Sequence, residues 1–289
     1  MKYYITWDLE KTVPLNTDNI YKVDEYIRKE LIDTINNSFG EKITKFIPYY
    51  EIKWFFEEKA NPDEFIISLD DGIYSNPDFN FSSTRMYKDK NSILNNPKNY
   101  KILQRNWKNL NEQLPKLKSI MKESWKNKVV LVDDGIFSWD TLNDILNILK
   151  KNNVKIDEIR VALNFSWNDS INWIKITSMF KGNCIEWIDE RDFFYGTKNW
   201  WASFFNTKWK INWLPYISSS EIASKKASIP EYNSKKFCEK MIWVNIDLYQ
   251  ETWKKFKLED IKRLSYLEEI YNPQIELVEL LKMEQKNLS

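Results

Sequence analysis

Histidine is absent from the 289-residue sequence. This absence excludes a histidine general base, a Ser–His or Cys–His catalytic pair and a histidine-ligated zinc site. Any chemistry must therefore use carboxylates, amines, hydroxyls, backbone amides or a hard metal ion.

Glycine and cysteine are scarce as well. The five glycines form neither a Walker loop nor a GxGxxG dinucleotide-binding loop. The two cysteines, Cys184 and Cys238, are not spaced as metal ligands and imply no disulfide framework. Such low cysteine usage favours a cytoplasmic location.

Long apolar runs and an excess of one charge are also missing. No stretch approaches the roughly 20 apolar residues of a spanning helix, and residues 1–13 contain no apolar signal segment, so we expect no membrane association. The net charge of +1 gives no strong signal for a nucleic-acid partner. The hydrophobic fraction of 43% is nevertheless enough for a packed core.

The clearest pattern in the chain is a strand, a helix and a second strand. Apolar residues predict strands at Val129–Val132 and Glu158–Asn164, and helical spacing predicts a helix from residue 139 or 140 to Lys151. A strand–helix–strand unit implies parallel strands, so we expect an α/β fold with a mainly parallel twisted sheet flanked by helices. Further strands are expected at Phe65–Leu69, Phe79–Tyr87 and Cys184–Ile188, and helices at residues 18–38 and in a C-terminal extension from 233 to 289.

Acidic residues follow three of the predicted strands. Asp70-Asp71-Gly72, Asp133-Asp134-Gly135 and Asp189-Glu190-Arg191-Asp192 each come directly after an apolar run. In open parallel sheets, ligands bind beyond the carboxyl ends of the strands, where such acids suit a hydroxylated ligand or Mg²⁺. The alternative is ordinary turn chemistry, because Asp and Gly also favour turns.

The loop after Val132 has an additional feature, because a predicted helix starts five or six residues further on. The backbone amides of a helix start bind phosphate, and the hydroxyls of Ser138 and Thr141 can join them.

The segment Val129–Leu142 resembles the phosphate-binding signature of type I phosphoribosyltransferases. The resemblance implies that Asp133 and Asp134 hold the ribose hydroxyls, often with Mg²⁺ nearby, and take the catalytic and metal-binding positions. It also implies a 5′-phosphate loop, formed by Gly135, Ser138, Trp139, Asp140 and Thr141.

The resemblance extends more weakly to residues 65–164. It implies a pyrophosphate-binding group made of Asp71, Gly72, Arg85 and Lys88, and an acceptor pocket near Asp189, Arg191 and Asp192. The lysine-rich residues 88–127 would form an inserted hood over the site. Residues 1–232 would then form the phosphoribosyltransferase-like domain, with residues 233–289 packed on it.

Two classes of function follow. The first is a transferase that uses phosphoribosyl pyrophosphate, or a related nucleotide or sugar phosphate, and an unidentified acceptor. The second is a non-catalytic relative that senses such a ligand and regulates a protein partner. Trp139 at a family glycine position, Phe137 and the acidic Asp70-Asp71 favour the second. A metal-dependent phosphohydrolase is a weaker third alternative.

Two features are left open by the sequence. The aromatic-rich residues 200–213 suit either core filling or base stacking. A homodimer is one alternative for the oligomeric state.

Overall fold

A computed structural model describes most of the chain. The described residues are 2–7, 20–39, 43–70, 73–95, 100–104, 109–136, 139–165, 168–181, 185–189, 193–194, 201–205, 211–226, 229–251, 257, 272 and 274–288.

The chain folds into two compact units, each built from separate stretches of sequence. The first unit comprises Met1–Phe46, Met86–Lys101 and Glu186–Ser289, and the second comprises Ile47–Arg85 and Ile102–Ile185. The boundary predicted after residue 232 falls inside the first unit, so the segments on both sides of it belong to the same unit.

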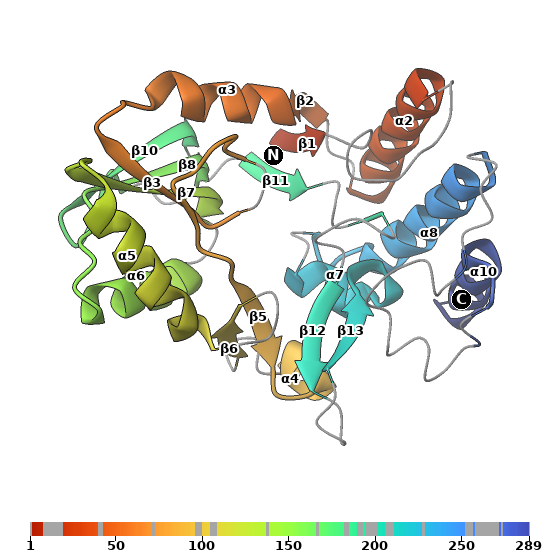
Figure 1. The fold of residues 1–289 in the computed structure, drawn as a ribbon. Helices are drawn as coiled ribbons and strands as arrows, with labels where there is room; N and C mark the ends of the chain where they lie inside the picture. The colour runs from red at the N-terminus through yellow and green to blue at the C-terminus, as the bar shows by residue number, and fades with distance from the viewer. Residues whose placement is uncertain are drawn as a thin grey trace. The chain divides into compact units, whose positions relative to one another are not determined.

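The second unit is a mixed α/β structure around a six-stranded sheet (Figure 1). The strand order is β4-β3-β7-β8-β10-β9, and every neighbouring pair is parallel except β10 with β9. Its strands are β3 Glu64–Ser68, β4 Phe79–Asn80, β7 Lys128–Ile136, β8 Glu158–Asn164, β9 Ser170–Ile171 and β10 Ile174–Lys181. The predicted mostly parallel sheet flanked by helices is therefore confirmed.

Helices cover both faces of this sheet (Figure 1). On one side lies α3 Tyr49–Lys59, which contacts β8 and buries Ile52, Phe55 and Phe56. On the other side lie α5 Leu114–Glu123, preceded by the 3-10 turn η1 Leu110–Gln113, and α6 Trp139–Lys151. The sheet is therefore the middle layer of three.

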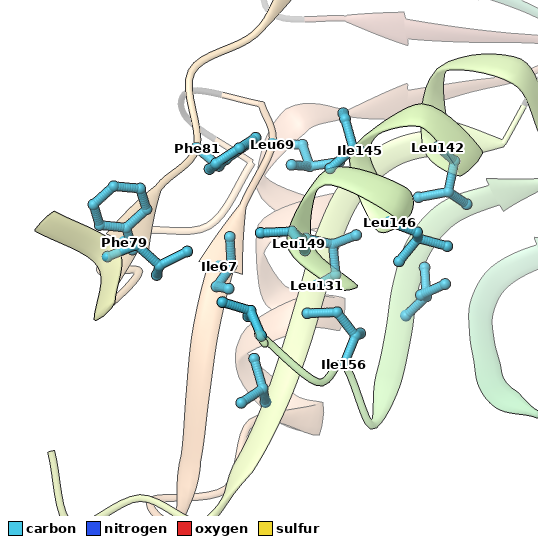
Figure 2. Packing of buried hydrophobic residues seen from close by; sticks show 14 of the residues in the cluster. Ile67, Leu69, Phe79, Phe81, Leu131, Leu142, Ile145, Leu146, Leu149 and Ile156 are labelled. Atoms are coloured by element: carbon cyan, nitrogen blue, oxygen red, sulfur yellow. The ribbon is translucent and has the colours of Figure 1, made fainter. Parts of the chain in front are cut away.

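The core beneath α6 shows why this segment is a helix. Leu142, Ile145, Leu146 and Leu149 recur at helical spacing and are buried, and Figure 2 shows them on the side of α6 that faces the sheet. The positive charges of Lys150 and Lys151 in the last turn interact favourably with the negative C-terminal end of the helix dipole. The predicted helix is thus confirmed in position and length.

Part of the predicted hood belongs to the same core. Leu110, Leu114 and Leu117 of η1 and α5 are buried beside Phe79 and Phe81. Pro115 stands in the first turn of α5, where proline is tolerated because no intrahelical hydrogen bond is lost. Residues 110–123 therefore form a layer of the fold.

A buried charged network lies at the amino ends of the parallel strands. Glu64 opens β3, Lys128 opens β7 and Glu158 opens β8. Arg160 donates from Nη1 to Glu64 Oε2 at 2.8 Å and from Nη2 to Glu64 Oε1 at 2.7 Å, and its Nε donates to Glu158 Oε1 at 3.1 Å. Lys128 Nζ lies 2.8 Å from Glu64 Oε1 and 2.5 Å from Glu158 Oε2. This network joins three strands at the edge opposite to the acidic strand ends.

The first unit contains two further sheets, of order β11-β1-β2 and β13-β12-β5-β6, and the unit boundaries fall within β2, β5, β6 and β11. Antiparallel β12 and β13 pair within the aromatic-rich residues 200–213 and the two residues that follow. The elements are β1 Lys2–Trp7, α2 Ile20–Phe39, β2 Ile43–Pro48, β5 Thr84–Tyr87, α4 Lys90–Asn95, β6 Tyr100–Leu103, β11 Ile185–Asp189, β12 Trp201–Phe205, β13 Ile211–Pro215, η3 Tyr216–Ser218, α7 Ser220–Lys226, α8 Ser234–Glu251 and α10 Leu277–Leu288.

Helix α8 packs against three other helices of the first unit, α2, α7 and α10. The expected helical C-terminal segment is thus present as α8 and α10. No helix among the described residues is long and apolar enough to cross a membrane.

Replacing Leu149 by alanine is expected to lower the free energy of unfolding by about 2–5 kcal/mol, because its side chain is fully buried between α6 and the sheet. Urea denaturation followed by circular dichroism measures this change. The control is Asp144→Ala on the exposed side of the same helix, with an expected change of less than about 0.5 kcal/mol. Equal stability of the two variants would contradict the packing role of Leu149.

Candidate functional site

The site begins where β3 ends beside β7. Ser68 pairs with Val132, and Leu69 N donates to Val132 O at 2.8 Å. Because the two strands are parallel and paired in register, Asp70, just beyond β3, and Asp133, within β7, lie towards the same end of the sheet. Asp70 is buried, and its carbonyl accepts a hydrogen bond from Ser68 Oγ at 2.7 Å.

The acidic pair lies in the sheet and not in a loop. Strand β7 continues to Ile136, four residues beyond the predicted end, and it pairs Asp133 with Val161 and Gly135 with Leu163 of β8. The difference arises because β8 extends equally far and supplies backbone partners. Asp133 is therefore fixed by the sheet ladder, and Asp134 follows it within the same strand.

Asp133 has an unfavourable environment for a charged carboxylate. Burial raises its pKa well above the ordinary value, and the negative charges of Asp134 and Asp70 raise the pKa further. The backbone amide of Asp134, which donates to Asp133 Oδ1 at 3.1 Å, and the positive charge of Arg85 act in the opposite direction. The site therefore favours a proton, a cation or a hydrogen-bonding hydroxyl at Asp133.

Arg85 connects this edge to the start of α6. Its Nε donates to Thr141 Oγ1 at 2.9 Å, and its charge acts on Asp133. Arg85 is exposed, whereas Thr141 is half-buried in the first turn of α6. The structure thus brings a guanidinium, a hydroxyl and the amides of a helix start to one place, which is the chemistry of a phosphate site.

The first turn of α6 carries two further predicted residues. Trp139 is half-buried and packs against the core of the sheet, and Asp140 is exposed. The proposed role of Trp139 and that of Asp140 in binding phosphate stay predictions.

The other predicted site residues are distributed differently. Lys88 lies in an exposed turn after β5, and Asp189 ends β11; both belong to the first unit, so their positions relative to Asp133 are not described. Several predicted residues lie outside the described residues, namely Asp71, Gly72, Phe137, Ser138, Arg191 and Asp192.

Sequence reasoning missed the part played by Asp70. It placed Asp70 at the carboxyl end of its strand but gave a binding role only to the following Asp71 and Gly72, whereas the charge of Asp70 acts on Asp133. The available signal was the parallel pairing of β3 with β7, because equal positions after neighbouring parallel strands meet at one edge.

A divalent cation fits this site only in part. Asp133 and Asp134 are hard oxygen donors whose mutual repulsion a cation would relieve. Within the described parts of the chain, no group of three or more Asp, Glu, Cys or His side chains is arranged to hold a metal ion. Mg²⁺ held here would therefore need oxygen ligands from a bound phosphate or from water, as is usual for this ion.

Comparison of the chain with protein-family models, with curated proteins and with solved structures found no match.

Proposed function

We propose that this protein is a divergent phosphoribosyltransferase-like protein that binds phosphoribosyl pyrophosphate or a related nucleotide or sugar phosphate. The supporting observation is the hydrogen bond from Arg85 Nε to Thr141 Oγ1 beside the Asp133–Asp134 pair. A phosphate group and a ribose in one molecule would need these two kinds of contact next to each other.

In this proposal the ribose hydroxyls bind to Asp133 and Asp134, directly or through Mg²⁺. The 5′-phosphate binds at the start of α6, to Thr141, to the helix amides and to Arg85. The sequence resemblance suggested a pyrophosphate role for Arg85, but its bond to Thr141 supports a role at the 5′-phosphate. The proposed fold type and the functions of Gly135, Ser138, Trp139 and Asp140 rest on the resemblance.

The proposed reaction is transfer of phosphoribose to an acceptor. The bond from ribose C1 to the pyrophosphate oxygen breaks, pyrophosphate leaves, and a nucleophile of the acceptor forms the new bond to C1. Positive charge develops on the ribose ring during this step. Carboxylates beside the ring stabilise it electrostatically. The site would lie in the second unit. We expect Mg²⁺ as its cofactor and the cytoplasm as the location of the protein.

Asp70 supports the alternative of a sensor without catalysis. Its carboxylate lies close enough to raise the pKa of Asp133, and a negative charge there disfavours a pyrophosphate group. A relative that binds a monophosphate and regulates a protein partner would tolerate Asp70. Release of pyrophosphate in the presence of candidate acceptors distinguishes the enzyme from the sensor.

Calorimetric titration tests the binding proposal, with phosphoribosyl pyrophosphate plus Mg²⁺, ribose 5-phosphate and AMP as ligands. We expect at least one to bind, and we expect Arg85→Ala to weaken that binding about 10- to 100-fold, because a charge-assisted phosphate contact is lost. The fold should be retained, since Arg85 is exposed.

The matched control is Lys118→Ala, which removes an exposed cation from α5 and should leave the affinity unchanged. If none of the three ligands binds the wild-type protein, the proposal is wrong. Equal affinity of Arg85→Ala and wild type would show that Arg85 does not contact the ligand.

A further inference from the structure

A second feature of interest is the turn between β9 and β10. Ile171 pairs with Ile174, so that Asn172 and Trp173 form a two-residue hairpin turn. Both residues have positive φ, 48° for Asn172 and 69° for Trp173. Such turns favour Asn-Gly, and a side chain with a Cβ is strained at the second position. Trp173 therefore occupies a position that local structure would give to glycine.

The Trp173 side chain gains nothing from burial to offset this strain. Its relative exposure is 101%, which is complete. An exposed indole beside a cavity offers apolar surface that a bound ligand can cover, and tryptophan is enriched among the residues that carry binding energy. A ligand that stacks on the indole ring would explain why tryptophan occupies this strained and exposed position.

A cavity lies beside this turn, within the second unit. Its volume is about 550 Å³, which is in the range of small-molecule sites. Aliphatic side chains and three asparagine amides contribute to its lining. Its polar lining residues are Asn147, Lys150, Asn153, Lys155, Asp157 and Asn172, and Trp173 of the turn also lines it.

The charges of this cavity suit a ligand with a single phosphate. Lys155 Nζ is paired with Asp157 Oδ1 at 3.0 Å, and Asp157 Oδ2 also accepts from Val129 N at 2.9 Å. Lys150 forms no salt bridge with any residue of the described ranges, and it is exposed. One lysine is therefore available to an anion.

We propose that this cavity binds one unpaired nucleotide, either free or within a single strand. The base stacks on the Trp173 indole, because every base offers a flat π-face. The amides of Asn147, Asn153 and Asn172 provide donors and acceptors for the edge of the base, as asparagine does for adenine. Lys150 binds the phosphate. The site is independent of the acidic strand ends and of the function proposed for them.

The test uses the full chain labelled with ¹⁵N-tryptophan. The indole N–H signal of Trp173 is assigned from its absence in Trp173→Gly and is followed during titration with AMP, with adenosine and with single-stranded oligoadenylate without a 5′-phosphate. We expect this signal to shift and saturate. Tighter binding of AMP assigns the pocket to a free nucleotide, and tighter binding of oligoadenylate assigns it to a strand.

Two variants and their controls make the test specific. Trp173→Gly should weaken binding about tenfold or more, while leaving the melting temperature equal or higher because glycine suits the turn. Lys150→Ala should weaken the binding of AMP but not that of adenosine, because only AMP carries a phosphate. The controls are Trp125→Ala, which removes another exposed tryptophan, and Lys116→Ala on α5, and both should bind as wild type.

The proposal is overturned if no adenine ligand moves the Trp173 signal, or if Trp173→Gly binds as well as wild type. Asp133→Asn together with Asp134→Asn should leave the Trp173 titration unchanged. Failure at either site is therefore distinguishable from failure at the other.

Discussion

Replacement of Arg160 by methionine is expected to lower the free energy of unfolding by about 3–5 kcal/mol at pH 7, because it leaves two buried carboxylates without their main partner. The side chains of Arg160, Glu64 and Glu158 are each only 5% exposed. Arg160 binds Glu64 through two nitrogen atoms and also donates to Glu158. Methionine has a similar length but can satisfy neither carboxylate.

The dependence on pH identifies the cause. Burial alone would raise the pKa of Glu158, but hydrogen bonds from Arg160, Lys128 and Thr177 outweigh it and lower the pKa to about 2 from the ordinary 4.5. The pKa of Glu64 is lowered by the same two cations. Because the folded pKa of Glu158 is depressed, its stabilising contribution is present above pH 4.5 and is lost as the pH falls towards 2.

In Arg160→Met we expect the opposite dependence of stability on pH. Without the guanidinium, burial raises the pKa values of the two carboxylates. Their protonation below about pH 5 then removes the cost of burying unpaired negative charges. The difference in stability from wild type should therefore shrink in acid. Denaturant titrations at several pH values measure it.

The control for Arg160→Met is Lys155→Met, which breaks an exposed ion pair and should change stability by about 0–1 kcal/mol. A loss that is equal at pH 7 and pH 4 would mean that Arg160 acts through packing of its stem and not through its charge.

Asp133→Asn together with Asp134→Asn is expected to weaken binding of a ribose phosphate at least about 100-fold, since two hydrogen-bonding carboxylates are lost. The stability of the double variant should be equal to or higher than that of wild type at pH 7. The reason is that the pKa of Asp133 is raised by burial and by the charges of Asp134 and Asp70, so its ionised form opposes folding above that pKa. In acid, where the carboxyl group is neutral, this gain should vanish.

Calorimetry with the same ligands and circular dichroism of the double variant measure both effects. The matched control is Asp144→Asn with Glu112→Gln, which removes the same two charges from exposed positions on α6 and η1. Unfolding of the double variant would show that the acidic pair is structural. Unchanged binding would place the ligand elsewhere.

The sequence by itself determined the central β7–α6–β8 unit. Alternation of apolar runs with a helical stripe is a local property, and it located α6 at Trp139–Lys151 and β8 at Glu158–Asn164. It also determined which chemistry is excluded, because a chain without histidine cannot use an imidazole.

Only the tertiary structure decided how these segments combine. The pairing of β3 with β7 makes Asp70 a neighbour of Asp133, and the contact between Arg85 and Thr141 joins residues 56 positions apart. The partners of Arg160 lie on β3 and β8, at sequence separations of 96 and 2. Contacts between residues far apart in the chain depend on register and layer packing, and no local pattern records them.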